Sequence, residues 1–153
     1  MLYTASYFEP THHHGKLIAI SRSVPKGFKV DGALDFLAPN AQLLDDWKAK
    51  SIDEAAYCQR YRSQIKQSWQ QVSDWLSSLD TKTTQTLLCW EPKGAFCHRN
   101  LVALLVCKHR PDVFGGCDVV RLEIPQCDLC QTELTVGLDA SFCPSCRTWR
   151  KNK

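Results

Sequence analysis

Two pairs of cysteines near the end of the chain carry the most specific chemical signal in the sequence. Cys127 and Cys130 form one Cys-x2-Cys turn, Cys143 and Cys146 form a second, and twelve residues separate the two pairs. Each turn presents two sulfurs to one ion, and four thiolates complete the tetrahedral shell of a structural zinc site. We therefore predict one structural Zn²⁺ ion on these four cysteines. Disulfides or unrelated buried thiols are the alternative.

A second group with chemical potential is Cys97-His98-Arg99, which stands just before the apolar run 101–106. The free backbone N–H groups and the dipole at a helix start favour a thiolate or a bound anion. A neighbouring imidazole can lower the thiol pKa further, and a guanidinium can hold a phosphate or carboxylate. This pattern predicts Cys97 as a nucleophile or redox thiol, His98 as its base and Arg99 as an anion-binding residue.

Other interpretations of this group remain open. Cys89, Cys97 and His98 could bind a metal ion, or the two thiols could form a redox pair. Alternatively, both thiols are small buried hydrophobic groups, and His98 and Arg99 simply begin a helix. A phosphatase-type Cys-x5-Arg is excluded because Ala103 stands where the arginine would be. The motifs GxxxxGK[ST], GxGxxG and HExxH and the His-x-Glu of zinc deaminases do not occur either.

Strands and helices alternate in the part of the chain that must position these residues. Apolar and β-prone runs predict strands over residues 2–8, 17–20, 86–90 and 119–124, the last after a Gly115-Gly116 break. Asn40 predicts the cap of a helix that continues to about Lys50. Ser51-x-x-Glu54 predicts the capping box of a long helix, whose apolar stripe runs from Tyr57 to Leu79. A third helix is expected over residues 99–109.

This order predicts an α/β fold. We expect residues 1–124 to form a small, mostly parallel sheet flanked by helices in a Rossmann-like three-layer arrangement. Residues 125–153 would form a zinc ribbon with a basic tail. Ligands of such sheets gather beyond the carboxyl ends of the strands, and the stretches 21–26 and 91–99 follow two predicted strands.

Three sequence stretches resemble a bacterial family known as domain of unknown function four-eight-eight. They are Ser21-Arg22-Ser23-Val24-Pro25, Tyr57-Cys58-Gln59-Arg60-Tyr61, and Cys89-Trp90-Glu91 leading to Cys97-His98-Arg99. The similarity covers about residues 1–124, and the zinc ribbon resembles an appendage of only some relatives. The resemblance implies an α/β domain and no established reaction. It also implies a shared cluster built from Arg22, Cys89, Glu91, Cys97, His98 and Arg99.

Charge and composition limit the kind of partner. The formal net charge is +3, and Arg147, Arg150, Lys151 and Lys153 contribute +4 of it, so the other residues sum to −1. The body is therefore not a basic, nucleic-acid-coating surface, although residues 147–153 could contact nucleic acid. The nine cysteines are an odd number, and no apolar run is long enough to span a membrane. We expect reduced thiols, a cytoplasmic location and no membrane partner.

Two functions follow from the sequence. In the first, the protein is an enzyme that acts on a small anionic substrate, nucleotide-like or phosphorylated. Cys97, His98, Glu91 and Cys89 would supply the chemistry, and Arg22 and Arg99 would bind the anion. In the alternative, the protein is a non-catalytic adaptor that binds nucleic acid or a protein partner through the zinc ribbon and the basic tail. The sequence does not indicate the oligomeric state.

Overall fold

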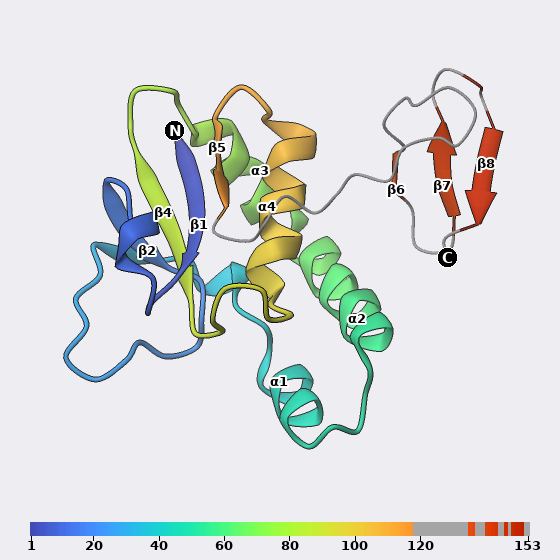
Figure 1. Ribbon diagram of the computed structural model, residues 1–153, viewed down its shortest axis with the longest axis horizontal. Coiled ribbons are helices and arrows are strands. Elements are labelled where there is room, and N and C mark those ends of the chain that lie inside the picture. Colours follow the sequence, from blue (N-terminus) through green and yellow to red (C-terminus); the bar gives the residue numbers. More distant parts are fainter. Residues whose placement is uncertain (118–134, 137–139, 144–145, 147, 152–153) are drawn as a thin grey trace. The chain divides into compact units, whose positions relative to one another are not determined.

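The chain forms two compact units, residues 1–120 and residues 121–153 (Figure 1). The computed structural model describes residues 1–117, 135–136, 140–143, 146 and 148–151. The predicted boundary after residue 124 and the predicted strand 119–124 both fall on residues outside this description.

The first unit contains a sheet of five parallel strands in the order β3-β2-β4-β1-β5. The central strand β4 (Gln85–Cys89) is almost entirely buried, as its apolar sequence predicts. It pairs with β1 (Leu2–Ser6) on one side and with β2 (Lys16–Ala19) on the other. The edge strands are β3 (Gly32–Ala33) and β5 (Phe114–Cys117). The predicted α/β fold with a parallel sheet is confirmed.

Four α-helices accompany the sheet. Helix α1 (Ala41–Lys48) starts as predicted, because the Asn40 side chain accepts a hydrogen bond from the Leu43 N–H at 2.8 Å. The predicted capping box at Ser51 is wrong. Asp53 caps α2 (Glu54–Gln67) instead, while the Ser51 hydroxyl donates to the carbonyl of Asp46 behind it.

The single long helix expected up to Leu79 is also wrong, because the chain breaks at Ser68. The Ser68 hydroxyl donates to the Gln64 carbonyl at 3.3 Å, a local bond that competes with the helical ladder. Helix α3 (Trp69–Ser78) follows the break, and α4 (His98–His109) occupies the position predicted for the third helix. Two short 3₁₀ turns, Pro10–His12 and Asp35–Leu37, complete the elements described within residues 1–117.

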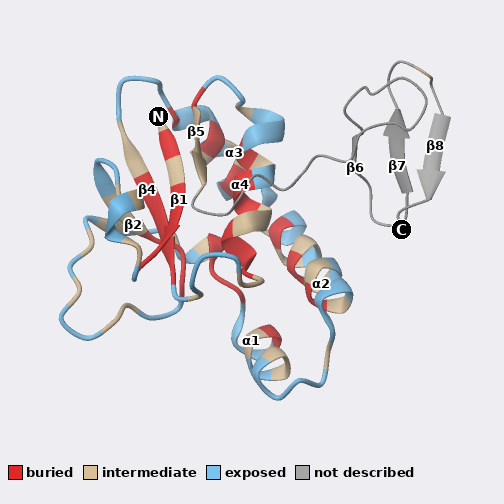
Figure 2. Cartoon of the chain, in the orientation of Figure 1, coloured by how far each residue is buried: buried red, intermediate tan, exposed pale blue. Residues whose placement is uncertain are grey.

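All four helices contribute to one hydrophobic cluster, which includes Leu2 of β1 and Leu87 of β4. The alternate strand residues Ala5 and Leu88 belong to a second cluster, which is covered by Val24, Phe28 and Val30 of the connection after β2. Figure 2 shows the buried residues along β1, β4 and α4. Within residues 1–117 the helices therefore pack on one face and an irregular segment covers the other. This arrangement differs from the expected three layers, because the connection after β2 covers the second face as an irregular segment and not as a helix.

The two glycines expected to break the chain lie inside β5. A Cβ atom on Gly115 would stand 2.5 Å from the ring of Tyr3 on the neighbouring strand β1. Glycine is thus required there because an aromatic ring packs directly on the backbone.

The second unit contains an antiparallel sheet of β6 (Thr135–Val136), β7 (Ala140–Cys143) and β8 (Thr148–Lys151), in that order. Of the predicted zinc ligands, Cys143 ends β7 and Cys146 lies in the turn that precedes β8. Cys127 and Cys130 lie outside the described residues. Among the helices that the structure describes, none is both long and apolar enough to cross a membrane.

Candidate functional site

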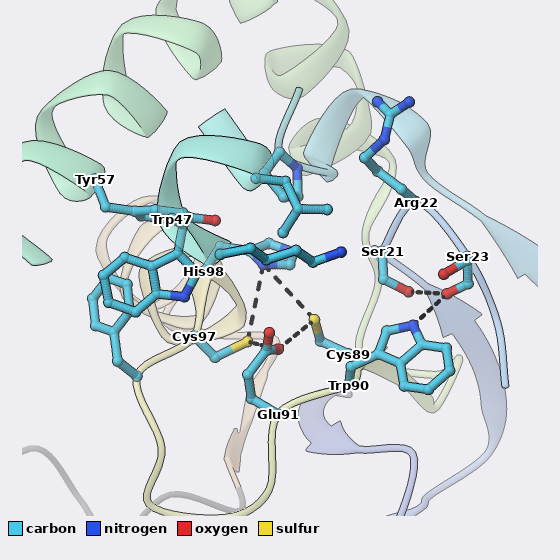
Figure 3. A pocket seen from close by; sticks show the side chains of 14 residues that line it. Ser21, Arg22, Ser23, Trp47, Tyr57, Cys89, Trp90, Glu91, Cys97 and His98 are labelled. Carbon is cyan, nitrogen blue, oxygen red and sulfur yellow. Dashed lines mark hydrogen bonds between the residues drawn. The ribbon is translucent and has the colours of Figure 1, made fainter. Parts of the chain in front are cut away.

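A cavity of about 380 Å³ lies at the carboxyl edge of the sheet (Figure 3). It forms where the segment after β2, the segment after β4 and the start of α4 meet, as the topology rule for parallel sheets leads one to expect. Its wall combines three kinds of side chain. The side chains that can react or bind a metal are Cys89, Glu91, Cys97 and His98. The cationic side chains are Arg22 and Lys48, and the aromatic ones are Trp47, Tyr57, Trp90 and Phe96.

Four reactive groups converge on one point of this wall. The Sγ atoms of Cys89 and Cys97 lie 3.0 and 3.1 Å from the same Glu91 oxygen, Oε2. Nδ1 of His98 lies 3.7 Å from the sulfur of Cys89 and 3.9 Å from that of Cys97. Figure 3 shows both sulfurs, the imidazole and the carboxylate facing one another. The structure thus brings all four predicted catalytic residues together.

A backbone carbonyl sets the orientation of His98. Its Nε2 lies 2.7 Å from the carbonyl oxygen of Ile20, which directly follows β2. A carbonyl can only accept, so Nε2 carries a hydrogen and donates it. In the neutral ring, Nδ1 therefore has a free lone pair, and it is this atom that faces the two sulfurs.

The position of Cys97 favours its ionised form. Cys97 is the N-cap residue of α4, and its sulfur accepts from the backbone N–H of Arg99 at 3.4 Å. Burial acts to raise the pKa of Cys97, but hydrogen bonds to Cys89 and His98 and the charge of His98 outweigh burial and lower this pKa to about 6. The hydrogen bond to Cys97 and burial together raise the pKa of Cys89. The two thiols are therefore unequal, and Cys97 ionises first.

The charges near Cys97 act in both directions, because His98 lowers the pKa of Cys97 whereas the Glu91 carboxylate acts to raise it. Burial acts to raise the pKa of Glu91, but the hydrogen bonds from the two thiols lower it, so Glu91 is a carboxylate. Burial acts to lower the pKa of His98, yet its hydrogen bond to Cys97 raises it. Protonated His98 beside ionised Cys97 is thus a favourable ion pair in a site from which water is largely excluded.

Arg99 does not occupy the position expected of an anion-binding residue. Its side chain is fully buried and does not line the cavity. The guanidinium donates from NH1 to the carbonyl of Glu91 at 2.7 Å and from NH2 to that of Pro92 at 3.3 Å. Arg99 therefore holds the segment that carries Glu91 against α4. The sequence did not indicate this, because an arginine at a helix start gives the same sequence pattern whether its side chain points outward or inward.

Arg22 lines the cavity as expected, but from its exposed rim. Figure 3 shows its guanidinium pointing away from the two sulfurs. The segment that carries it is well fixed, since Ser21 Oγ donates to the Ser23 carbonyl at 2.7 Å and Trp90 Nε1 donates to the same oxygen at 2.7 Å. The Tyr7 hydroxyl in turn lies 2.8 Å from Ser21 Oγ. Arg22 thus stands at the entrance, apart from the reactive groups.

Several cavity residues were missed by sequence reasoning. Trp47 and Lys48 end α1, and Tyr57 belongs to α2. Trp47 packs against Phe96 with ring centroids 4.9 Å apart, and against Tyr57 at 5.4 Å. No spacing in the sequence relates residues 47 and 48 to residues 89–98, because the contact depends on how α1 docks. An aromatic residue beside a lysine at a helix end was the only available signal.

The same cluster has the donor atoms of a metal site. The Sγ atoms of Cys89 and Cys97 and a ring nitrogen of His98 all lie within 4.8 Å of one another, and all three residues are buried. These residues could hold a metal ion. Thiolate and imidazole are the ligands that zinc and other soft or borderline metals prefer.

Comparison with known protein families assigns most of the chain to one of them. A family model described as the active DUF488-N3 subclade matches residues 2–110. No curated protein and no solved structure matches the chain. The matched range contains the whole cavity and ends before the second unit begins.

Proposed function

The chain belongs to the DUF488 family, in its N3 subclade, and on that premise we propose that it is an enzyme acting on a small anionic substrate bound in the cavity. One observation carries this proposal. Two buried thiols, a buried imidazole and a partly buried carboxylate meet at the wall of a cavity that is open to a ligand. Burying several ionisable groups together lowers the stability of a fold, and such clusters are typical of functional sites.

In this proposal Cys97 is the nucleophile and His98 carries its proton. Transfer of the thiol proton to Nδ1 of His98 gives a thiolate and an imidazolium. The thiolate then adds to an electrophilic carbon or phosphorus atom of the substrate. The displaced group leaves with its electron pair and takes the proton back from His98. Cys89 and Glu91 support the step, since the former donates a hydrogen bond to the thiolate and the latter stabilises the imidazolium.

The cavity wall supports a nucleotide-like or phosphorylated substrate. Its volume lies in the range of ligand pockets, roughly 300–1,000 Å³. Arg22 and Lys48 supply positive charge at the exposed side, where a phosphate would stay partly hydrated. Trp47 and Phe96 offer aromatic faces to a planar ring. Burial raises the pKa of Tyr57, so its hydroxyl remains a neutral hydrogen-bond donor.

Adenosine monophosphate is a suitable first probe for this proposal. It should slow the alkylation of Cys97 by iodoacetamide, measured by peptide mass mapping, because it fills the route to the sulfur. Arg22→Ala should weaken this protection. Lys93→Ala is the matched control, since Lys93 is exposed but does not line the cavity. Equal protection in both variants would remove Arg22 from the binding site, and no protection by this probe or by inorganic phosphate would contradict an anionic substrate.

For the second unit, we propose a structural zinc ion on Cys127, Cys130, Cys143 and Cys146. The spacing supports it, as do the positions of Cys143 at the end of β7 and of Cys146 in the turn before β8, the strand that pairs with β7. Cys127→Ser should lower the zinc content of the protein. The alternative function as an adaptor rests on this unit and stays a prediction. Deletion of residues 147–153 should then abolish salt-sensitive nucleic-acid binding.

A further inference from the structure

We propose that Cys89, Cys97, His98 and Glu91 form a zinc site, and that a bound zinc ion masks the nucleophile. The masking rests on the proposed function, because it assumes that Cys97 reacts when it is metal-free. The site itself rests only on the arrangement of the four donors. It would be a second zinc site, separate from the four cysteines predicted to bind zinc in the other unit.

The separations between each sulfur and the nitrogen and oxygen donors fit a tetrahedral ion. With Zn–S bonds of about 2.3 Å and Zn–N or Zn–O bonds of about 2.0–2.1 Å, tetrahedral geometry places a sulfur about 3.5 Å from a nitrogen or oxygen ligand. Here the two sulfurs lie 3.7 and 3.9 Å from Nδ1 of His98, and 3.0 and 3.1 Å from Oε2 of Glu91. Each separation is therefore within about 0.5 Å of the value for a zinc shell. Small side-chain shifts would complete the site.

The surroundings of His98 match those of a metal-binding histidine. Such a residue typically donates its second ring N–H to a carboxylate or backbone carbonyl, which fixes the ring and directs the other nitrogen at the ion. His98 makes this contact with the Ile20 carbonyl at 2.7 Å. Its Nδ1 is thereby aimed at the point where the two sulfurs and the carboxylate meet. The ligand set is thus supported by a contact that is not itself part of the set.

Charge and burial favour an ion of this kind. Cys89, Cys97 and His98 are 2%, 3% and 4% exposed. Zinc binding would release two protons, one from Cys89 and one shared by the Cys97–His98 pair, and the two thiolates would balance the charge of the ion. The net charge of the buried cluster would stay that of Glu91. Two thiolates also discriminate against magnesium and calcium, which prefer oxygen ligands.

Occupation of this site would remove the reactivity of Cys97. A thiolate that shares its electron pair with zinc is a much weaker nucleophile than a free thiolate, and the ion would stand between the sulfur and the cavity. Substrate and zinc would compete for one sulfur. Zinc would therefore keep the enzyme inactive and protect the thiol from oxidation until a chelator or a competing protein removes the ion.

The first test is a zinc count on the full-length chain. Wild type, Cys89→Ser and Cys107→Ser are loaded with zinc, dialysed and analysed for zinc per chain. Cys107 is the matched control, because it lies on α4 but is exposed and outside the cluster. Wild type and Cys107→Ser should each hold one more zinc ion than Cys89→Ser. Because the difference is what counts, zinc in the second unit does not affect the result. Equal contents in all three proteins would overturn the site.

A second measurement guards against misfolding of the variant. Wild-type protein is stripped with a chelator, and the alkylation rate of Cys97 is measured before and after zinc is added back. Zinc should block alkylation of Cys97 and leave that of Cys107 unchanged. An unchanged rate at Cys97 would overturn the masking. A Cys89–Cys97 disulfide in freshly isolated protein that holds no extra zinc would overturn the site itself.

These outcomes separate the inference from the proposed function. If Cys97 is unreactive even after chelation while the zinc difference persists, the metal site stands and the nucleophile fails. If Cys97 is reactive but zinc neither binds nor protects it, the nucleophile stands and the metal site fails.

Discussion

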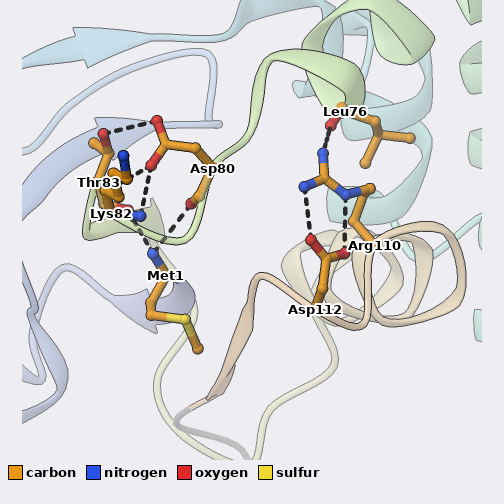
Figure 4. Close-up of polar contacts among 7 residues, drawn as sticks. All are labelled: Met1, Leu76, Asp80, Lys82, Thr83, Arg110 and Asp112. Atoms are coloured by element: carbon orange, nitrogen blue, oxygen red, sulfur yellow. Dashed lines mark hydrogen bonds and ion pairs between the residues drawn. The ribbon is translucent and has the colours of Figure 1, made fainter.

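The two edges of the same sheet hold polar groups in opposite ways. At the amino edge, the amine of Met1 donates to the Thr83 carbonyl, and Asp80 accepts from the backbone N–H groups of Lys82 and Thr83 (Figure 4). These contacts are exposed to water. At the carboxyl edge, two buried thiols and a buried imidazole meet a partly buried carboxylate. Water can replace the partners at the first edge but not at the second, where electrostatic interactions are correspondingly stronger.

Cavity size does not distinguish the two edges. A hollow of about 270 Å³ near the amino edge is lined by residues that include Ile18, Trp75, Asp80 and Gln85. Among the described residues that line it there is no cysteine, histidine, lysine or arginine. The carboxyl-edge cavity is only moderately larger, yet its wall contains thiols, an imidazole and cationic side chains. The chemistry of the wall, and not the volume, marks the carboxyl-edge cavity as the candidate functional site.

The largest effect on stability should come from Arg99. Arg99→Met would leave the carbonyls of Glu91 and Pro92 without these donors, at a cost of roughly 1–3 kcal/mol for each buried group. We expect a loss of about 2 kcal/mol or more in the free energy of unfolding, measured by urea denaturation. A loss no greater than that of an exposed arginine variant would mean that the buried guanidinium does not hold the loop.

A smaller effect, on reactivity, should follow from Cys89→Ala. The Cys97 thiolate would lose a hydrogen-bond donor, so its pKa would rise and less thiolate would be present just below neutral pH. A hydrogen bond to a charged group is worth roughly 1.5–3 kcal/mol, so we expect alkylation of Cys97 in chelator-treated protein to slow by about tenfold or more. Faster alkylation would show that Cys89 shields the nucleophile and does not activate it.

Trp90→Phe should have a modest effect. It removes the 2.7 Å hydrogen bond from the indole to the Ser23 carbonyl, which links the segments after β4 and β2. We expect a loss of about 1 kcal/mol in the free energy of unfolding. Arg22 should also be held less firmly, so protection of Cys97 by adenosine monophosphate should weaken. Unchanged protection would show that Ser21 and Tyr7 fix the segment without the indole.

The smallest effect should come from Arg110→Met at the opposite edge. Arg110 resembles Arg99 in donating to a backbone carbonyl, that of Leu76 at 2.7 Å, but it is partly exposed and pairs with Asp112. Water can take over these contacts. Thermal unfolding should shift far less than in Arg99→Met. A comparable shift would remove the contrast between the two edges.

The sequence was sufficient for features that depend on local pattern. Asn40 capped a helix as predicted, because an N-cap bond joins residues only three apart. The apolar run 86–90 gave the central strand with an offset of one residue. The carboxyl-edge rule predicted that the stretches 21–26 and 91–99 meet, and residues of both line the cavity because parallel strands end on the same side.

The features that the sequence did not predict depend on contacts between residues far apart in the chain. The apolar stripe from Tyr57 to Leu79 continues across Ser68, so periodicity alone could not locate the break between α2 and α3. The Arg99 side chain points inward, where it donates hydrogen bonds to the backbone carbonyls of Glu91 and Pro92. Trp47 and Lys48 entered the cavity only through the docking of α1. No sequence spacing encodes these three outcomes.

The most direct test of the central claim compares two cysteines of the same helix: Cys97, which caps the start of α4, and Cys107, which lies within α4. Chelator-treated wild-type protein is reacted with iodoacetamide just below neutral pH, and the initial rates at Cys97 and Cys107 are measured by peptide mapping. Although Cys97 is buried and Cys107 is exposed, Cys97 should react faster, because it is ionised and reachable through the cavity. Faster labelling of Cys107, with Cys97 unmodified, would contradict a reactive thiol at the carboxyl edge.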